Sequence, residues 1–161
     1  MSVVEETRVV NGPIDQAWAE ISHMGAVQDW HLNVASAVVL TAHDTGIGAS
    51  RRVEFYSGGG TVETVVEESE QQFTTVEMTG SPMIKKALVT IRTKERSADT
   101  TDVTFSIDYS MKFGPIGWLM DVAMMRRIFG KKVFPAALVG LSYHLETGNL
   151  VTDSIPDRTV A

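Results

Sequence analysis

The sequence predicts an α+β domain in which a curved antiparallel sheet of six to seven strands wraps around one long C-terminal helix. Two observations lead to this expectation. Residues 34–112 alternate apolar and polar side chains with a period of two and are divided by short turns, which indicates successive β-strands. Residues 115–147 instead place apolar side chains three or four positions apart, which indicates a helix. Strands joined directly by short turns form an antiparallel meander, and one amphipathic helix can cover its apolar face.

The elements follow in a simple order along the chain. A strand over 3–10 is followed by apolar residues at helical spacing over 14–21, and a second short helix is expected over 26–30. The strands of the meander are then expected at 34–41, 48–57, 60–69, 72–79, 84–96 and 101–112. A strongly curved sheet around a single helix leaves a space between the two, so a ligand cavity of several hundred Å³ is expected, which is the usual scale of such sites.

The last helix is expected to supply the other wall of this space. Its apolar stripe comprises Trp118, Val122, Met125, Phe129 and Val133. Pro135 lies inside the helix and lacks a backbone N–H, so we expect a kink there. Gly148 is a natural C-cap. We therefore expect one domain over residues 1–148 and a flexible C-terminal tail over 149–161.

The composition restricts the classes of function. The chain has 161 residues, of which 43% are hydrophobic, so one domain can build a core without disulfides. It contains no cysteine, which excludes thiolate nucleophiles and is compatible with a reducing cytoplasm. The net charge of −6 argues against nucleic acid as a partner. No apolar run approaches the length of a membrane span, and the acidic start is unlike a signal peptide, so we expect a cytoplasmic protein.

Several stretches carry a resemblance to a known family. They are VNGPIDQAWAEI, DWH, GASRRVEFYSGGGTVETVVEES, FGPIGWLMD and GLSYHLETG. Together with the order of the elements, they resemble the polyketide cyclase/dehydrase branch of the START-like (SRPBCC) superfamily, whose relatives include the major birch pollen allergen and the plant abscisic-acid receptors. The resemblance covers residues 3–147. It implies the helix-grip fold and a ligand-binding cavity.

Matching to the plant receptors assigns roles to particular positions. Trp30-His31 corresponds to an aromatic–lysine pair whose lysine holds the ligand's carboxylate, and Glu63 corresponds to a glutamate that contacts ligand through water. Residues 57–61 resemble the gate loop and residues 80–83 the latch loop. The loop residues concerned are Gly58, Gly59, Gly60, Ser81, Pro82 and Met83. On the last helix, the matched pocket-lining positions are Phe129, Val133 and Ala137.

The chain also departs from those receptors. His31 replaces the lysine, residues 57–61 lack the proline-alanine of the gate, and residues 80–83 lack the histidine-arginine of the latch. Hormone recognition of the plant kind is therefore not implied. The expected apolar lining of the cavity comprises Trp30, Met78, Met83, Trp118, Met125, Phe129, Val133 and Ala137. The methionines among them give an adaptable lining or are plain core.

Three side chains are candidates for ligand contact or acid–base chemistry in the cavity. His31 could anchor a ligand carboxylate or carbonyl, act as a general base, or be a helix-end histidine without a role. Only the resemblance places the Glu63 side chain on the inner face of the sheet. The pattern of its neighbours Val62 and Thr64 does not show which face of the strand Glu63 occupies. Tyr109 lies on a strand face with core residues, and its hydroxyl needs a partner if it is buried.

Charged side chains on one strand pose a further question. Arg51 and Arg52 are adjacent on a strand, so one of them must face the interior, and Arg52 is our candidate for the ligand contact, although the sequence does not decide between them. A buried arginine needs a counter-charge, which Glu54 or Glu63 could supply.

Other motifs favour plainer interpretations. The glycines at 58–60 lack the lysine and helix of a phosphate loop and indicate a hairpin turn. The basic cluster Arg126, Arg127, Lys131 and Lys132 spreads around the helix, which favours a solvated surface over transient contact with an anionic membrane. The histidines show no metal-binding spacing, and no nucleotide motif is present, so no metal or other cofactor is expected.

Two hypotheses of function follow. The first is a protein, monomeric or homodimeric, that binds a small apolar molecule such as a lipid, isoprenoid or polyketide. The second is an enzyme of the cyclase/dehydratase kind, working without metal or nucleotide, in which His31, Glu63 or Tyr109 moves protons. The two differ in whether polar groups converge on one point of the cavity. The sequence shows no dense acid–base constellation, which favours binding.

Overall fold

In the computed structural model, which describes residues 2–153, seven antiparallel strands form one sheet in the order β1-β7-β6-β5-β4-β3-β2. The strands are β1 (Ser2–Val10), β2 (Val34–Val39), β3 (Ser50–Phe55), β4 (Gly60–Ser69), β5 (Phe73–Thr79), β6 (Ile84–Ser97) and β7 (Thr100–Met111). Each predicted strand is present, and its ends differ by no more than two residues from the expected ones. The first strand, β1, pairs with the last strand, β7, and the sheet is open, with β1 and β2 at its two edges.

Two groups of helices accompany the sheet. Between the first two strands lie α1 (Ile14–Ser22), the 3₁₀ turn η1 (Met24–Ala26) and α2 (Val27–Trp30). After the last strand comes one continuous helical stretch, composed of α3 (Gly114–Met120), η2 (Asp121–Met125), α4 (Arg126–Ile128), η3 (Phe129–Val133) and α5 (Phe134–Thr147). Gly148 ends this stretch in a left-handed conformation, with its N–H bonded to the His144 carbonyl at 2.8 Å, as expected for a C-cap.

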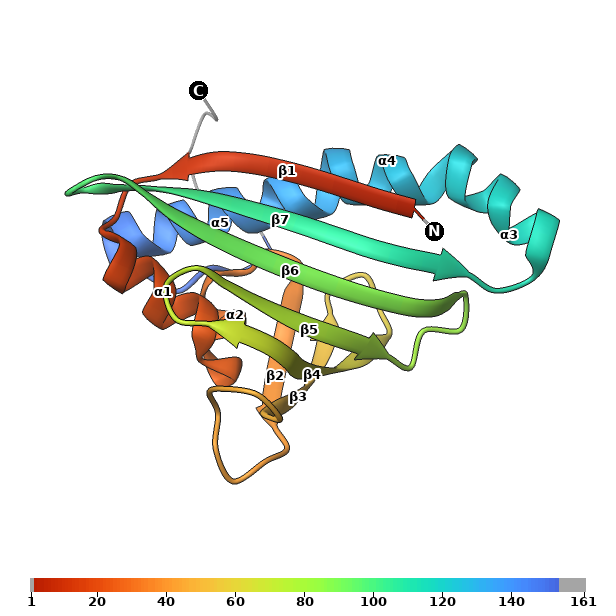
Figure 1. The fold of residues 1–161 in the computed structure, drawn as a ribbon, viewed down its shortest axis with the longest axis horizontal. Helices are drawn as coiled ribbons and strands as arrows, with labels where there is room; N and C mark the ends of the chain where they lie inside the picture. The colour runs from red at the N-terminus through yellow and green to blue at the C-terminus, as the bar shows by residue number, and fades with distance from the viewer. Residues whose placement is uncertain (1, 154–161) are drawn as a thin grey trace.

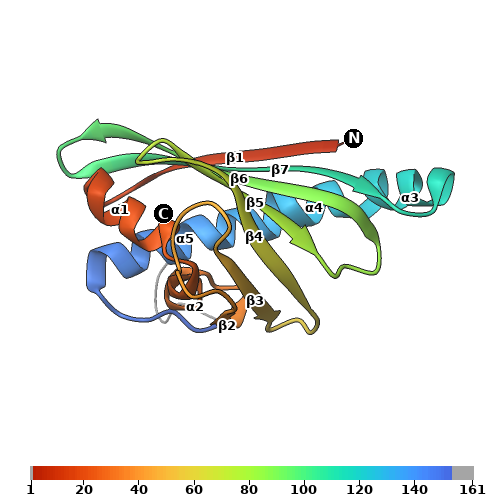
Figure 2. The same cartoon turned by 60° about the horizontal axis from the view of Figure 1, so that its bottom comes forward.

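The sheet is twisted around the long helix. In Figure 1, β1, β7 and β6 run along the helix, whereas β2 and β3 are turned steeply across that direction. Figure 2 shows the same helix passing beneath β1 and β7, with β4 and β5 descending beside it. Right-handed twist accumulates from strand to strand, and this bends the sheet into the predicted grip. The predicted α+β class and helix-grip arrangement are confirmed.

Pro135 does not break the helix. It falls in the first turn of α5, directly after the π-helical turn η3, whose wider hydrogen bonding tolerates the missing N–H. A second π-turn, η2, precedes η3. Each π-turn rotates the side chains that follow it about the helix axis, relative to those of a regular α-helix. The predicted stripe is therefore divided. Its second part packs against the core through Met125, Phe129 and Val133, whereas Trp118 and Val122 are exposed.

The long helix meets α2 at a point where only glycine fits. A Cβ on Gly140 would lie 2.1 Å from the carbonyl oxygen of Trp30 and 3.2 Å from Cγ of Leu32. We expect Gly140→Ala to lower the free energy of unfolding by about 1–3 kcal/mol, because overpacking outweighs alanine's better helix propensity. Urea denaturation checks this against Ser142→Ala on the same helix, and equal stability of the two variants would contradict the close contact.

The end of the described chain returns to the second helix. The backbone N–H of Val151 donates to the carbonyl oxygen of Asp29 at 3.0 Å, and the Val151 side chain is buried. Most of the predicted flexible tail, residues 154–161, lies outside the described residues. Within residues 2–153, no helix is long and apolar enough to cross a membrane.

Candidate functional site

A cavity of about 290 Å³ lies between the concave face of the sheet, the first helices and the long helix. Its volume is close to the lower end of the usual range for small-molecule sites, as predicted. Most of its wall is aliphatic or aromatic. The polar side chains in the lining are His31, Asn33, Arg51, Ser57, Thr61, Glu63, Thr74 and Ser81.

An ion pair lies at one wall of the cavity. Arg51 on β3 is directly opposite Glu63 on β4, so strand pairing places both side chains on the concave face. The Nε and one terminal nitrogen of Arg51 lie 2.7 and 2.5 Å from Oε2 of Glu63, and its other terminal nitrogen donates to the Met24 carbonyl at 3.1 Å. Both side chains are about nine-tenths buried. Mutual neutralisation is what makes two buried charges tolerable here.

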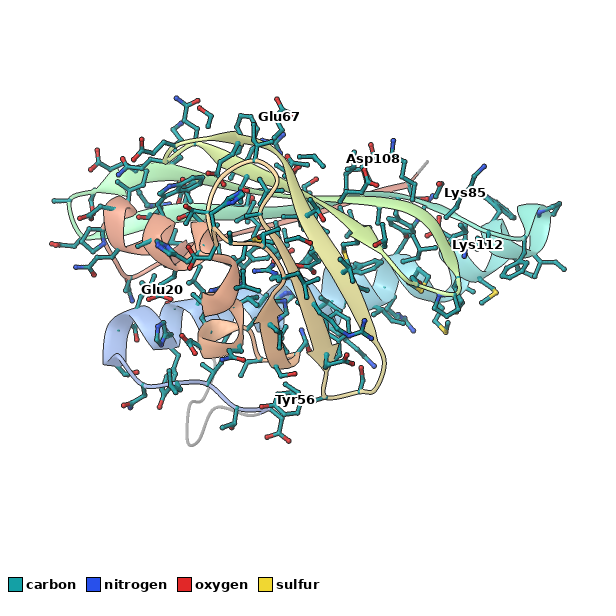
Figure 3. All side chains as sticks on the ribbon, turned by 90° about the horizontal axis from the view of Figure 1, so that it is seen from below. Glu20, Tyr56, Glu67, Lys85, Asp108 and Lys112 are labelled. Atoms are coloured by element: carbon teal, nitrogen blue, oxygen red, sulfur yellow. The ribbon has the colours of Figure 1, made fainter. Side chains whose placement is uncertain are left out.

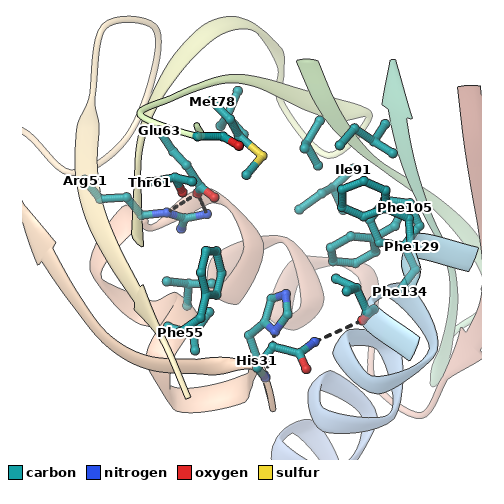
Figure 4. Close-up of a pocket in the computed structure, with 18 of the residues that line it drawn as sticks. His31, Arg51, Phe55, Thr61, Glu63, Met78, Ile91, Phe105, Phe129 and Phe134 are labelled. Atoms are coloured by element: carbon teal, nitrogen blue, oxygen red, sulfur yellow. Dashed lines mark hydrogen bonds and ion pairs between the residues drawn. The ribbon is translucent and has the colours of Figure 1, made fainter. Parts of the chain in front are cut away.

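Two oxygen atoms beside this pair remain available. Among the described residues, the buried hydroxyl Oγ1 of Thr61 has no hydrogen-bond partner. No described group hydrogen-bonds to Oε1 of Glu63 either, since both arginine contacts are to Oε2. Figure 4 shows Thr61, Glu63 and Arg51 together on one wall, facing the cavity. A buried polar group without a partner is costly, so this wall is suited to a ligand that supplies the missing hydrogen bond.

His31 faces the same cavity from the end of α2. Its ring stacks on Trp30, with ring centroids 5.5 Å apart, and Trp30 is itself held by a bond from its indole nitrogen to the Glu20 carbonyl at 3.1 Å. The backbone N–H of Asn33 donates to Nδ1 of His31 at 3.2 Å, so Nδ1 is an acceptor and the neutral ring carries its hydrogen on Nε2. Figure 4 shows the His31 ring directed into the cavity.

The charge state of His31 follows from its surroundings. Burial, and secondarily the charge of Arg51, lower the pKa of His31 to about 3. The imidazole is therefore neutral at pH 7 and can donate a hydrogen bond from Nε2, but it cannot offer a positive charge to a carboxylate. A base with so low a pKa is also inefficient at taking a proton near neutral pH. Of the roles considered for His31, hydrogen-bond donation fits this environment best.

The opposite wall is aromatic. Phe105 on β7 packs on Phe134 with ring centroids 5.6 Å apart, and Phe129 packs on Phe134 at 5.9 Å. Figure 4 shows these rings facing Met78 and Glu63 across the cavity. The cavity is therefore polar at one wall and apolar over the rest, which suits a molecule with an apolar body and a single polar group.

The structure brings most of the predicted lining residues together. Those that line the cavity are Trp30, His31, Glu63, Met78, Met125, Phe129 and Val133. Met83 and Ala137 do not line it: Ala137 is fully buried in the core, and Met83 lies in the loop beyond Ser81.

Arg52 is a correction. It is exposed and pairs with Glu54 at 2.9 Å on the outer face of the sheet, while its neighbour Arg51 takes the interior position. Trp118 is a second correction, since it is 63% exposed. β1 begins at Ser2, opposite Tyr109, and β7 ends two residues further on at Met111, so the sheet does not cover Trp118.

Tyr109, predicted to contact a ligand in the cavity, does not line it. It is fully buried, but its hydroxyl donates to Asp121 instead of facing the cavity. Burial, followed by the bond to Asp121, raises the pKa of Tyr109. Burial alone would raise the pKa of Asp121, but hydrogen bonds from Ser2 and Tyr109 and the charge of Arg126 outweigh it, and this pKa is lowered. These groups tie the start of β1 to the long helix.

The two glycine-containing loops lie side by side. A Cβ on Gly80 would be 4.0 Å from the carbonyl oxygen of Gly60, which brings residues 57–61 next to residues 80–83. Ser57, Thr61 and Ser81 of these loops line the cavity, whereas Gly58, Gly59, Gly60 and Pro82 do not.

Thr61 is not among the residues predicted from the sequence, and Arg51 is named there only as the alternative to Arg52, although a signal exists for both. Arg51 has the same strand parity as buried Val53, and Thr61 and Glu63 have the same parity as buried Val65. The apolar residues two positions further along each strand therefore mark the inward face.

A comparison with family models matches residues 1–146 to the family described as polyketide cyclase / dehydrase and lipid transport. The chain belongs to this family. The resemblance to the polyketide cyclase/dehydrase branch is thereby confirmed. A search of curated protein sequences finds no match.

Solved structures of other proteins show the same fold. A START superfamily protein from Mycobacterium smegmatis is 14% identical, with 89% of this chain and 97% of that chain covered and a TM-score of 0.74. Norcoclaurine synthase from Thalictrum flavum is 14% identical, with 91% and 87% covered and a TM-score of 0.69. The di-domain ARO/CYC protein BexL of the BE-7585A biosynthetic pathway is 14% identical, with 91% and 47% covered and a TM-score of 0.70. At these identities the likeness concerns the fold alone.

Proposed function

We propose that the protein binds one small, electrically neutral molecule with an apolar body and a hydroxyl or carbonyl group, of the lipid, isoprenoid or polyketide kind. The observation that carries this proposal is the unpartnered Thr61 hydroxyl beside the buried Arg51–Glu63 pair, within an otherwise apolar cavity. A ligand hydroxyl could bond to Thr61 and to Oε1 of Glu63. A carbonyl oxygen could accept from Thr61 or from Nε2 of His31.

The charges around the cavity favour a neutral ligand. The charge of Arg51 is cancelled by Glu63, and His31 is neutral. A free carboxylate would have to give up its hydration without gaining an unpaired cation, which is unfavourable in an apolar site. This differs from the carboxylate anchor that the plant receptors imply at the position of His31.

A cyclase/dehydratase activity is the second candidate, and one observation favours it. Of the three acid–base candidates, Tyr109 is committed to Asp121 and His31 is a weak base, but Oε1 of Glu63 faces the cavity without a partner. Glu63 could therefore accept a proton from a bound polyketide chain. Product analysis with a linear polyketide as substrate tests this. If the protein is an enzyme, the wild type should convert the polyketide and Glu63→Gln should not, whereas a wild-type protein that forms no product would contradict the activity.

Binding itself is tested with Thr61→Val. This change removes the unpartnered hydroxyl at nearly constant volume, so we expect the free energy of unfolding to stay equal or rise. The affinity for decanol should fall about five- to tenfold, the cost of one hydrogen bond, while the affinity for decane is unchanged. Displacement of the neutral fluorophore N-phenylnaphthylamine measures both ligands. Decanoate should bind more weakly than decanol to the wild-type protein.

Thr75→Val on the neighbouring strand β5 is the matched control, because it also replaces one buried hydroxyl by one methyl group. The Thr75 hydroxyl bonds to that of Thr90 at 2.9 Å and does not line the cavity, so its loss should lower stability and leave both affinities unchanged. Equal loss of decanol affinity in both variants, or tighter binding of decanoate than of decanol, would overturn the proposed ligand class.

A further inference from the structure

The long helix begins with an apolar segment that the sheet does not cover. We call residues 113–124 the apolar segment. Its large side chains Phe113, Ile116, Trp118, Leu119, Val122 and Met124 are between 44% and 67% exposed. Figure 1 shows α3 extending past the ends of β1 and β7. A cluster of this kind on a protein surface marks a site of interaction.

The apolar segment is held firmly in its exposed position. Gly117 packs so closely on the preceding turn that a Cβ there would lie 1.9 Å from the Lys112 carbonyl oxygen. One turn later, buried Asp121 accepts hydrogen bonds from the hydroxyls of Ser2 and Tyr109. These two contacts attach one side of the helix to the sheet and leave the large apolar side chains directed elsewhere.

The backbone at the start of the segment is also strained. Phe113 has a φ of 72°, a left-handed conformation that is unfavourable for a bulky residue, and its side chain is 64% exposed. It therefore gains little packing in return for the strain. Strain without a packing return indicates a position kept for interaction.

Positive charge surrounds the segment in an otherwise acidic chain. Residues 112–132 contain the five basic residues Lys112, Arg126, Arg127, Lys131 and Lys132 and one acidic residue, Asp121, a net charge of +4 in a chain of −6. Asp121 is buried, and all five basic residues are exposed. Figure 3 shows Lys85 of β6 near Lys112 at the same end of the molecule.

We propose that the apolar segment and its basic surroundings dock on the surface of an anionic lipid bilayer. Exposed Trp and Leu side chains beside lysine and arginine complement the apolar–anionic boundary of such a bilayer. A second copy of the chain fits less well, because a symmetric contact would bring two basic surfaces together. The proposal goes beyond ligand binding in the cavity.

The docking surface adjoins the cavity. Met125 and Ile128, which follow the segment on the same helix, line the cavity wall. The Lys112 ammonium donates to the carbonyl oxygen of Ser81, a cavity-lining residue of the neighbouring loop, at 3.3 Å. An apolar ligand exchanging between the bilayer and the cavity would thus meet apolar side chains of one continuous helix.

Vesicle binding tests the proposal with the full chain. Trp118 is exposed, whereas Trp18 and Trp30 are buried, so a blue shift of tryptophan emission on vesicle addition reports on Trp118. We expect sedimentation with, and a blue shift on, phosphatidylcholine vesicles containing about a third phosphatidylglycerol, and little of either with phosphatidylcholine alone. The double variant Trp118→Ser/Leu119→Ser should lose about a hundredfold in affinity for the anionic vesicles.

Further variants separate charge, strain and folding. Arg127→Gln/Lys131→Gln/Lys132→Gln should weaken binding about tenfold or more, as should added salt. Phe113→Asn suits the left-handed backbone, so it should keep or raise thermal stability while binding falls. The control Val38→Ser/Leu40→Ser removes exposed apolar side chains on the opposite edge of the sheet and should bind like the wild type.

Several outcomes would overturn the proposal. One is equal binding to neutral and anionic vesicles, and another is binding to anionic vesicles that survives the serine and glutamine substitutions. A third is a concentration-dependent dimer that Trp118→Ser/Leu119→Ser abolishes, because this would assign the surface to a second copy of the chain. Decanol affinity should be unchanged in all these variants. A failure of cavity binding is therefore distinguishable from a failure of docking.

Discussion

Glu63→Ala is expected to lower the free energy of unfolding by about 3–5 kcal/mol, because it leaves the Arg51 guanidinium buried without its counter-charge. The remaining bond from Arg51 to the Met24 carbonyl cannot replace a carboxylate. Urea denaturation at pH 7 measures the effect. The exposed pair Arg52 and Glu54 on the same strand is a matched control, since breaking an exposed pair by Glu54→Ala should cost only about 0–1 kcal/mol.

The double variant Arg51→Met/Glu63→Met separates stability from binding. Replacing a buried ion pair by apolar residues of similar size is often neutral or stabilising, so the double variant should be far more stable than Glu63→Ala. Its affinity for decanol should nevertheless fall toward its affinity for decane, because the polar wall is gone. If the double variant were as unstable as Glu63→Ala, the pair would be required for folding and its assignment to ligand binding would lose its support.

The second large effect concerns pH. The pKa of His31 falls from 6.5 in the unfolded chain to about 3 in the native protein. Above pH 6.5 the ring is neutral in both states, and its contribution to stability is fully present. As the pH falls from 6.5 toward 3, the unfolded chain binds a proton that the native state does not, so stability is lost by up to about 1.4 kcal/mol per pH unit.

His31→Gln isolates this contribution, because glutamine can donate a hydrogen bond but does not titrate. The unfolding free energy of the wild type minus that of His31→Gln should fall steadily as the pH is lowered from 6.5 to 4, because the carboxylate contributions cancel in this difference. Parallel curves for the two proteins would show that His31 is not buried in a neutral state. His43→Gln, at an exposed histidine, is the control and should follow the wild type.

The architecture could be predicted because it depends on patterns that are local in the sequence. Period-two alternation from Val34 onward, short turns between strands and helical spacing after Pro115 each restrict the backbone independently of distant residues. Together those patterns predicted a meander followed by one helix. Few arrangements of these elements bury both the apolar face of the sheet and the apolar face of the helix. The cavity followed from the same geometry.

The polar site depended on information that is not local. The register between β3 and β4 sets Arg51 opposite Glu63, and this pairing supplies the counter-charge that the buried guanidinium needs. The low pKa of His31 arises from burial by several elements and from the charge of Arg51, and neither is visible at position 31 in the sequence.

The helix provides the clearest contrast between what the sequence determined and what the tertiary structure decided. By itself, the sequence determined that residues after Pro115 form a helix and that it carries a stripe of large apolar side chains. Only the tertiary structure decided which of them are buried, because the π-turns rotate the stripe and because β1 and β7 end at Ser2 and Met111. Trp118 therefore lies on the surface and Phe129 in the cavity wall, although both belong to one pattern. Periodicity reports that a side chain is apolar, whereas burial also requires another part of the chain to lie opposite it.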